Sequence, residues 1–340
     1  MQAVSSDTHW KVLIADSEFA DAAAELSSRF DRLELICATA ENDVHALATP
    51  DVDVLITQFV PVDQPLLDRL SGLSTLLKLG RNYYNVDVEA VRSRDLTFVC
   101  VPRKGPNCVA ELALALIFAL SKDLLASHDS VAEGAYRYRG LTPKITAERK
   151  MAFHWMHNTR VHEIENKTLG IVGLGEIGGE LARRTSVMGM RNLYYKRSQL
   201  SPELEQLYDV TYRPLDELLQ ESDYVCLAVP HTVATEKMIG ASQLALMKET
   251  AYLVNICRGG VVDEDALIAA LTEDRLAGAG LDVFTYEPLD VSSPLCLLDN
   301  VILTPHIGGG SGTNRVIELT AALEELARIL AGERPKIVIS

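Results

Sequence analysis

Short apolar runs alternate with amphipathic stretches over residues 11–101. The runs are KVLIAD (11–16), LELICA (33–38), VDVLIT (52–57), LLKLG (76–80) and LTFVCV (96–101), with amphipathic stretches such as 18–29 and 63–72 between them. Strands this uniformly apolar are typically covered on both faces, as in a parallel sheet wrapped by helices. The pattern therefore predicts an α/β fold in which strands and helices alternate.

The middle of the chain changes character twice. Residues 108–125, CVAELALALIFALSKDLL, are apolar nearly all round, which predicts a buried helix between two domains. Residues 127–163 are polar and aromatic without a clear period, and from Glu133 to His162 they carry six Lys or Arg against two Glu. In an acidic chain, this basic segment is typical of an arm or a long functional loop.

The alternation resumes at Lys167. The runs TLGIVG, NLYYK, YVCLAV, AYLVNIC, GAGLDV and VILTP follow one another, and a last helix is predicted over 312–331 after HIGGGSG. A chain of 340 residues exceeds the usual size of one hydrophobic core, so two domains are expected.

Composition narrows the class of protein. The net charge of −15 argues against nucleic acid or an anionic membrane as a partner, since both are polyanions. No apolar run approaches the roughly 20 residues that span a bilayer, and the start MQAVSSDTHWKVLIAD has no signal-peptide pattern. A cytoplasmic protein is therefore expected. The six cysteines are scattered, which indicates mostly reduced, buried side chains. Cys257 is expected to be a packed strand end; a reactive thiolate is the alternative, because a neighbouring Arg and a following helix start would lower its pKa.

A glycine motif is the clearest candidate for ligand binding. TLGIVGLGEIGGE places G-x-G-x-x-G at Gly173, Gly175 and Gly178, after a predicted strand and at the start of a predicted helix. The glycines permit a tight turn, close approach of a pyrophosphate and close packing of helix on strand. The phosphates then meet the amide groups of the helix N-terminus. The context predicts dinucleotide binding, with a tight structural turn as the alternative.

The residues after the next strand bear on which nucleotide binds. An NAD site usually has Asp or Glu about 20 residues past the glycines, accepting from the ribose 2′-hydroxyl. Lys196, Arg197 and Ser198 stand at that place. Two cations and a hydroxyl suit a 2′-phosphate, so NADP(H) is favoured, with NAD(H) as the other candidate. A solvated basic turn without a ligand is the alternative interpretation.

Three ionisable residues follow the ends of successive predicted strands. Arg258 ends YLVNIC, Glu287 follows GLDVFTY, and His306 follows VILTP. Ligands of such sheets bind outside the carboxyl ends of the strands, where these side chains can converge. Each also has a structural interpretation. Arg258 would cap a helix or pair with Asp263, Glu287 would lie in a solvated turn, and His306 would have a purely structural role. Asp263 itself is expected to cap the helix EDALIAAL.

Several longer stretches carry a family resemblance. They are TLGIVGLGEIG, VPHTVATEKMIG (229–240), LVNICRGGVVDEDALIAAL, GAGLDVFTYEPL and LTPHIGGG, extended into the first half by LGRNYYNVD (79–87) and GPNCVAELALAL (105–116). In this order and spacing, the chain resembles the D-2-hydroxyacid dehydrogenases, including the glyoxylate/hydroxypyruvate reductases. The resemblance implies two Rossmann-like doubly wound parallel-sheet domains. An NAD(P)-binding domain of residues 108–307 would be inserted into a flavodoxin-like substrate domain of residues 1–107 and 308–340.

The resemblance also implies the chemistry and the site. Arg258 would hold the substrate carboxylate and polarise the carbonyl, His306 would give the proton, and Glu287 would orient the imidazole. Asp282 would fix the nicotinamide carboxamide. Besides the glycines and 196–198, the cofactor residues implied are Glu176, Ile177, Val229, Pro230, Thr235, Cys257, Asp282 and Gly308. The substrate residues implied are Phe59, Leu79, Gly80, Arg81, Arg258 and His306.

The substrate expected is a small unphosphorylated 2-keto acid, reduced to a D-2-hydroxy acid. The stretch TQFVPVDQ lacks the arginines that relatives acting on phosphorylated substrates place near it, and Gln58 and Phe59 favour a partly apolar substrate side chain. The loop LGRNYY departs from the family pattern G-x-G-x-D-N at Asn82 and Tyr84, which leaves its substrate contacts open.

Other interpretations concern the basic segment and the activity. In relatives this part of the chain forms a dimer arm, so a homodimer with an arm at 127–163 is expected. His154, His157 and His162 would suit a metal, but no fourth ligand has suitable spacing, so no metal site is expected. The C-terminal-binding co-repressors share the fold and similar site residues, so a nucleotide-sensing binding protein is the alternative function.

Overall fold

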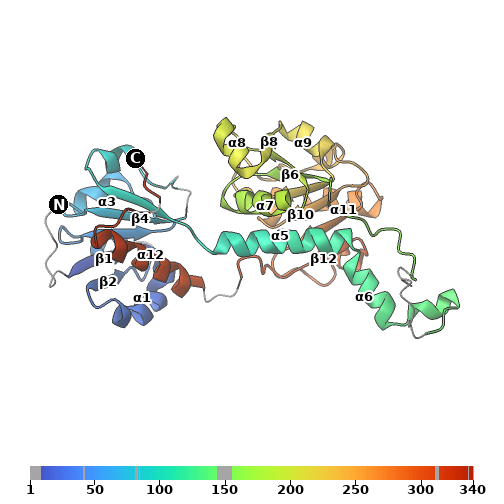
Figure 1. The fold of residues 1–340 in the computed structure, drawn as a ribbon, viewed down its shortest axis with the longest axis horizontal. Coiled ribbons are helices and arrows are strands. Elements are labelled where there is room, and N and C mark those ends of the chain that lie inside the picture. The colour runs from blue at the N-terminus through green and yellow to red at the C-terminus, as the bar shows by residue number, and fades with distance from the viewer. Residues whose placement is uncertain are drawn as a thin grey trace. The chain divides into compact units, whose positions relative to one another are not determined.

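The chain divides into two compact units, which are described separately. The first unit comprises Met1–Gly105 and Gly310–Ser340, and the second unit, inserted between them, comprises Pro106–Gly309. Each unit is built on a parallel sheet covered by helices (Figure 1). The predicted fold class, two parallel α/β domains with the cofactor domain inserted, is confirmed. The computed structural model describes residues 9–40, 43–80, 83, 85–143, 155–310, 314–335 and 337–339.

The first unit has a five-stranded sheet in the order β2-β1-β3-β4-β5. Its strands are β1 Trp10–Ile14, β2 Leu33–Cys37, β3 Val54–Thr57, β4 Thr75–Leu79 and β5 Thr97–Val101. Its helices are η1 Ser17–Phe19, α1 Ala20–Leu26, η2 Ser27–Arg29, α2 Val44–Leu47, α3 Gln64–Arg69, α4 Val88–Arg92 and α12 Asn314–Leu330.

Two apolar cores cover the two faces of this sheet, because successive side chains along a strand point to opposite faces. Leu13 packs toward α2, α3 and α4, whereas Ile14 packs toward α1 and α12. Leu319 and Leu323 of α12 are fully buried, and α12 lies beside α1 (Figure 1). The end of the chain therefore completes a core that the start of the chain begins.

The second unit has a seven-stranded sheet in the order β12-β11-β10-β9-β6-β7-β8. Its strands are β6 Thr168–Val172, β7 Arg191–Tyr195, β8 Val210–Tyr212, β9 Tyr224–Leu227, β10 Tyr252–Asn255, β11 Gly278–Leu281 and β12 Val301–Leu303. Its helices are α5 Gly105–Ser121, α6 Leu124–Ala132, η3 Ala135–Arg139, α7 Glu176–Val187, α8 Pro202–Tyr208, α9 Leu215–Glu221, α10 Ala241–Leu244, η4 Gly259–Val261, α11 Glu264–Thr272 and η5 Pro294–Leu297.

The same alternation separates two cores in the second unit. Tyr224 and Cys226 face the core formed with α5 and α7, whereas Val225 and Leu227 face the core formed with α9, α10 and α11. Helix α5 is therefore buried against the sheet along one side.

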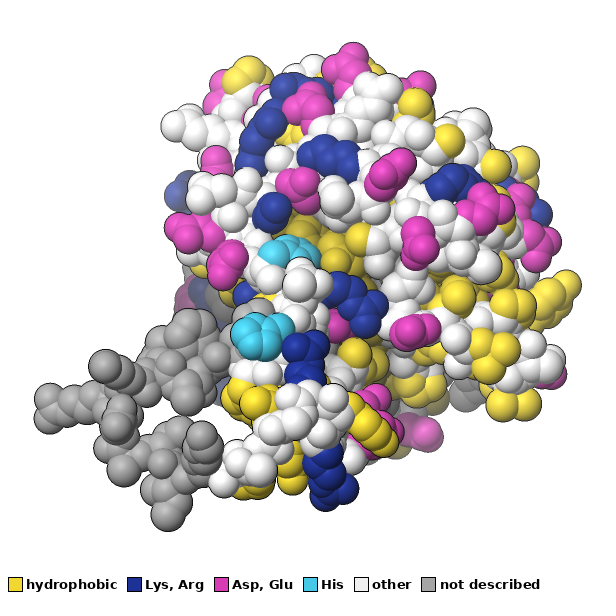
Figure 2. Space-filling view, turned by 90° about the vertical axis from the view of Figure 1, so that its right-hand side faces the viewer, with side chains coloured by type: hydrophobic (Ala, Val, Ile, Leu, Met, Phe, Trp, Pro, Cys, Tyr) yellow, Lys and Arg dark blue, Asp and Glu magenta, His cyan; other side chains and the backbone are white. Residues whose placement is uncertain are grey.

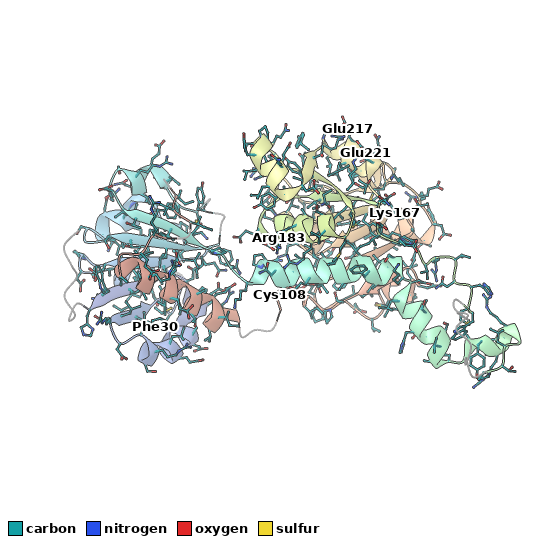
Figure 3. All side chains as sticks on the ribbon, in the orientation of Figure 1. Phe30, Cys108, Lys167, Arg183, Glu217 and Glu221 are labelled. Carbon is teal, nitrogen blue, oxygen red and sulfur yellow. The ribbon has the colours of Figure 1, made fainter. Side chains whose placement is uncertain are left out.

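An ion-pair network holds the last residue of α9. Glu221 on α9 (Figure 3) accepts from Arg191 Nη2 and from Arg213 Nε, each at 2.7 Å. Arg191 begins β7 and Arg213 follows β8. One carboxylate thus ties the helix to the two outer strands on this side of the sheet.

The segment after α5 differs from the sequence prediction. The helix predicted over 108–125 spans Gly105–Ser121, and after Asp123, in a left-handed conformation with φ of 45°, α6 continues to Ala132. Residues 127–132, which show no clear period in the sequence, thus belong to this helix. Helix α6 has no buried residue, so no apolar stripe in the sequence could reveal it.

The described part of the chain contains no helix that is both long and apolar enough to cross a bilayer.

Candidate active site

The glycine motif forms a turn that requires glycine at two positions. Gly173 has a φ of 101°, and a Cβ there would lie 2.5 Å from the carbonyl oxygen of Ala228. A Cβ at Gly178 would lie 2.4 Å from the carbonyl oxygen of Gly173. Strand β6 therefore turns into α7 more tightly than any side chain would allow.

Gly175 differs from the other two glycines, because a Cβ there would have no heavy atom within 4 Å. It is the N-cap of α7 and provides no side-chain cap, so the first amide groups of the helix face open space. Glu176 and Ile177 form the first turn and are half-buried. An uncapped helix N-terminus beside open space fits the pyrophosphate of a dinucleotide.

The turns after β7 and β9 flank the glycine turn. Gly173 N donates to Tyr195 O at 2.9 Å, and Ala228 N donates to Val172 O at 2.8 Å. Strand β6 is the point where the strand order reverses, which is where such sheets bind nucleotides. The predicted cofactor residues on these two turns are Lys196, Arg197 and Ser198, all exposed, and Val229 and Pro230.

The turn after β9 is closed on itself and bonded to the segment that carries Arg258. Thr235 Oγ1 donates to Pro230 O at 2.7 Å and accepts from Thr232 N at 2.8 Å. Lys237 N donates to Gly260 O at 2.7 Å, and Ile239 N donates to Val261 O at 3.1 Å. The predicted cofactor residues after β9 are thereby held next to η4.

Arg258 follows β10 and its side chain is exposed. Asn255 Nδ2 donates to Arg258 O at 3.0 Å, and Arg258 Nη1 donates to Cys257 O at 2.6 Å. A Cβ at Gly259 would lie 1.9 Å from the carbonyl carbon of Phe284, so this glycine permits the close contact of two backbones. That contact brings the segment of Arg258 against the segment that leads to Glu287.

The structure bears on two alternatives raised for the Arg258 segment: an ion pair of Arg258 with Asp263 and a reactive thiolate at Cys257. Asp263 caps α11 by accepting from Ala266 N, and its carboxylate pairs with Lys237 at 3.3 Å rather than with Arg258. Cys257 is buried, and burial raises the pKa of its thiol to about 11, which agrees with a packed strand end rather than the alternative of a reactive thiolate.

Glu287 and His306 form a direct pair. His306 Nδ1 lies 2.6 Å from Glu287 Oε2, and Phe284 N donates to Glu287 Oε1 at 3.1 Å. Partial burial opposes the ionised form of Glu287, but the hydrogen bonds from His306 and Phe284 outweigh it and lower the pKa of this carboxyl. The charge of Arg258 acts in the same direction.

The loop that carries His306 is anchored by Asp282, whose side chain is buried. The carboxylate accepts from Thr304 Oγ1 at 2.6 Å, from Ile307 N at 2.9 Å and from Gly308 N at 2.8 Å. His306 lies between these donors with a φ of 53°. Thr304 was not among the predicted residues, and its position two residues before the histidine in LTPH is the signal that could have found it.

The parallel register explains why residues so far apart in sequence reach one edge. Leu227 pairs with Asn255, Asn255 with Leu281, and Leu281 with Leu303. Arg258, Glu287 and His306 follow three of these strand ends. The structure therefore gathers them on the carboxyl edge of the sheet that also bears the glycine turn.

The predicted substrate residues of the first unit lie at the carboxyl edge of its sheet. Phe59 is exposed after β3, Leu79 ends β4 and is buried, and Gly80 follows with a φ of 98°. Arg81 lies outside the described residues. Asp16, which sequence reasoning missed, holds the loop of Phe59 by accepting three amide hydrogen bonds, from Gln58, Phe59 and Val60 at 2.5, 2.6 and 3.2 Å.

The histidines of the basic segment have other partners. His162 Nε2 lies 2.6 Å from the hydroxyl of Tyr224, and its ring stacks on Tyr252. His154 lies outside the described residues. Among the residues that are described, no group of three or more His, Cys, Asp or Glu could hold a metal ion.

A dinucleotide-type glycine turn next to an Arg, Glu and His edge defines the class of NAD(P)-dependent oxidoreductases. Comparison with known proteins agrees. The family model described as D-isomer specific 2-hydroxyacid dehydrogenase, NAD binding domain, matches residues 114–308. The chain belongs to the D-isomer specific 2-hydroxyacid dehydrogenases, oxidoreductases that act on CH–OH groups with NAD(P).

Relatives of known identity span most of the chain. A glyoxylate reductase of Thermococcus gammatolerans is 38% identical over 291 residues, covering 85% of this chain and 83% of the relative. A glyoxylate/hydroxypyruvate reductase B of Escherichia fergusonii is 35% identical over 292 residues, covering 86% of each chain. The crystal structure of a glyoxylate reductase from Paecilomyes thermophila superimposes with a TM-score of 0.63 at 26% identity, covering 98% of both chains.

Proposed function

We propose that this protein is a reductase of small, unphosphorylated 2-keto acids that prefers NADPH and forms D-2-hydroxy acids. The observation that carries the proposal is the gathering of Arg258, Glu287 and His306 on the sheet edge that bears the glycine turn. The curated relatives named glyoxylate reductase and glyoxylate/hydroxypyruvate reductase B support a small 2-keto acid as the substrate.

The arrangement supports a division of labour. Arg258 binds the substrate carboxylate with its fork of N–H donors and polarises the adjacent carbonyl. Bound nicotinamide, when reduced, supplies the hydride to the carbonyl carbon. His306 gives the proton from Nε2 to the carbonyl oxygen, because Nδ1 is occupied by Glu287. Glu287 fixes the ring orientation and stabilises the protonated imidazole through its carboxylate.

The residues after β7 support NADPH as the nucleotide. Lys196, Arg197 and Ser198 are exposed directly beyond the strand whose last carbonyl is bonded to Gly173. No carboxylate stands in 196–201, KRSQLS, to accept from a ribose 2′-hydroxyl or repel a 2′-phosphate. The basic turn therefore supports binding of a 2′-phosphate over a free hydroxyl.

We assign the cofactor to the second unit and the substrate side chain to the first. Phe59 presents an exposed ring, and Arg103 lies over it with its guanidinium carbon 5.8 Å from the ring centroid. Phe59, together with Leu79, Gly80 and Arg81, forms the set of substrate residues that the family resemblance implies in this unit. The guanidinium of Arg103 is already paired with the buried Glu318 at 3.1 Å, so the apolar ring supports a substrate without a phosphate group.

The segment α6–η3 supports a homodimer. Its exposed hydrophobic side chains are Leu124, Leu125, Val131 and Tyr138. Figure 2 views the protein from the right-hand side of Figure 1, and hydrophobic side chains lie on the face that it shows among charged ones. Apolar side chains gathered on an otherwise solvated segment are typical of a surface that a partner subunit covers. Gel filtration with light scattering tests the oligomeric state directly.

The function is tested by a screen of 2-keto acids with both nucleotides. Glyoxylate, hydroxypyruvate and bulkier keto acids should oxidise NADPH faster than NADH, and chiral analysis of the product should give the D-isomer. Phosphorylated keto acids should be poor substrates. Absence of turnover with every keto acid, in a folded protein that binds nucleotide, would contradict the proposal and favour a nucleotide-sensing binding protein.

A further inference from the structure

Strand β7 carries, one residue before its end, a tyrosine whose hydroxyl reaches beyond the strand. Tyr194 is fully buried in the core that contains α5 and α7, and its ring packs edge-on against Tyr212 of β8 with centroids 5.5 Å apart. Its hydroxyl accepts from Leu200 N at 2.8 Å and donates to Glu205 Oε1 at 2.7 Å. A core side chain is therefore bonded to the end of the connection between β7 and α8 and to the first turn of α8.

These bonds close the turn that contains the basic residues. Leu200 comes directly after the exposed residues 196–199. The hydrogen bond from its backbone N–H to the Tyr194 hydroxyl therefore fixes where the turn returns to the sheet. Gln199 Nε2 donates to the same oxygen of Glu205 at 3.0 Å. The backbone that presents Lys196, Arg197 and Ser198 is thus held at its start by strand β7 and at its end by the Tyr194 hydroxyl.

The Tyr194 hydroxyl also binds a carboxylate of α8. Glu205 lies in the first turn of α8, and its Oε1 receives hydrogen bonds from Tyr194 and Gln199. Burial raises the pKa of Tyr194 to about 12, so the hydroxyl keeps its proton and remains a donor at neutral pH. Glu205 Oε1 is therefore occupied by these two neutral donors rather than by Lys196 or Arg197.

A fixed turn matters because Lys and Arg have long, flexible side chains. Ordering such side chains on a ligand costs conformational entropy, and a backbone already held in place reduces that cost. Phosphate binding also weakens when a carboxylate can approach the cations. The Tyr194 hydroxyl acts on both factors at once.

We propose that Tyr194 is a positioning residue for nucleotide choice: its hydroxyl fixes the turn of Lys196, Arg197 and Ser198 and restrains Glu205, which favours a 2′-phosphate. The inference rests on the proposed NADPH preference and assigns its origin partly to a buried core residue. Residues 196–198 would touch the phosphate, whereas Tyr194 would act through them.

The test compares Tyr194→Phe with Tyr212→Phe by calorimetric binding of 2′,5′-ADP and of 5′-AMP to the full chain. Tyr194→Phe keeps the ring and removes only the hydroxyl, so binding of 2′,5′-ADP should weaken about tenfold, since one hydrogen bond to a charged network is lost. Binding of 5′-AMP should change by less than about twofold. Tyr212→Phe, which removes a hydroxyl from the ring packed against Tyr194, should affect neither ligand.

Hydrogen exchange separates turn order from stability. Amides 196–201 should exchange faster in Tyr194→Phe than in Tyr212→Phe, whereas amides 171–180 around the glycine turn should be unchanged. Glu205→Gln keeps an acceptor for Tyr194 but removes the charge, so it should bind 2′,5′-ADP at least as tightly as the wild type.

The outcomes distinguish the two proposals. If the wild type binds 2′,5′-ADP no better than 5′-AMP, the proposed NADPH preference fails and this inference fails with it. If the wild type prefers 2′,5′-ADP but Tyr194→Phe retains the whole preference, or weakens both ligands equally, only the role of Tyr194 is overturned.

Discussion

The two sheets place polar residues at the same edge but use them differently. At the carboxyl edge of the first unit, the Asp16 carboxylate accepts hydrogen bonds from three backbone amides. Lys78 Nζ donates to the carbonyl oxygens of Gln58 and Leu79 at 2.6 and 2.7 Å. Glu318 of α12 accepts from Arg103 at 3.1 Å and from Arg315 at 3.0 Å. Asp16, Lys78 and Glu318 are all buried.

At the carboxyl edge of the second unit, the corresponding charged residues are exposed. Lys196, Arg197, Arg258 and His306 present their side chains to solvent, each supported by bonds made by a neighbour. The buried carboxylate of Asp282 does not face solvent, because it accepts hydrogen bonds from the loop that carries His306. A charged residue at a strand end therefore indicates a ligand site when it is exposed on a supported loop, and a structural clamp when it is buried among partners.

The largest effect is expected at the exposed edge. His306→Asn removes the proton donor and should lower kcat for 2-keto acid reduction about 1,000-fold. The free energy of unfolding should fall by no more than about 1 kcal/mol, because the exposed side chain contributes to the fold through its hydrogen bond with Glu287. Steady-state NADPH oxidation and urea unfolding measure the two quantities. A kcat within tenfold of the wild type would place the proton donor elsewhere.

The buried edge should respond in stability. Asp16→Asn replaces a carboxylate that accepts three amide bonds with a group that has one acceptor oxygen, and should cost about 2 to 3 kcal/mol of unfolding free energy in the first unit. Trp10 fluorescence in a Trp155→Phe background follows this unit during urea unfolding.

A matched control sharpens this second comparison. Asp51→Asn changes an exposed carboxylate of the same unit, paired with Lys11 at the surface, and should leave the unfolding midpoint unchanged. Nucleotide binding by the second unit should be the same in both variants. Equal urea unfolding midpoints for Asp16→Asn and Asp51→Asn would contradict a stabilising role for the three hydrogen bonds of Asp16.

A smaller effect is expected from pH, through Glu287. Its pKa in the folded protein lies below the ordinary 4.5, so the unfolded chain binds the proton more readily. The stabilisation linked to this carboxylate is complete above about pH 4.5 and is lost as the pH falls through the lower folded pKa. Unfolding free energies between about pH 5 and pH 3 should show this loss in the wild type. The loss of unfolding free energy at low pH should be smaller in Glu287→Gln. Identical pH profiles of stability for the variant and the wild type would contradict a role for this carboxylate.

The smallest effect concerns two thiols. Cys257 is buried with its pKa raised to about 11, whereas Cys296 is exposed. Iodoacetamide at pH 8 should alkylate Cys296 and spare Cys257, with activity retained. Peptide mass spectrometry locates the adduct, and rapid labelling of Cys257 in the folded protein would show that its burial is transient.

Much of the fold follows from local sequence pattern. The apolar runs predicted each strand from β1 to β5, and the parallel topology explains why Arg258, Glu287 and His306 reach one edge. Helix α6 escaped prediction because a helix without a buried face has no periodic apolar positions. The bonds of Asp16 and of Asp282 also escaped, because each joins segments that are distant in sequence and meet only once the sheet is assembled. Tyr194 belongs to this second group, since a buried tyrosine in a strand gives no sign of where its hydroxyl points.

The insertion of the second unit has a consequence for biosynthesis. The first unit needs Leu319 and Leu323 of α12 to cover Ile14 and its neighbours, yet the 204 residues of Pro106–Gly309 are translated in between. At about 5 to 20 residues per second, the nascent first unit waits roughly 10 to 40 seconds on the ribosome with that apolar face uncovered. The inserted unit can fold during this delay, so the part of the enzyme made first is the last to be finished, and it is the part that chaperones must shield.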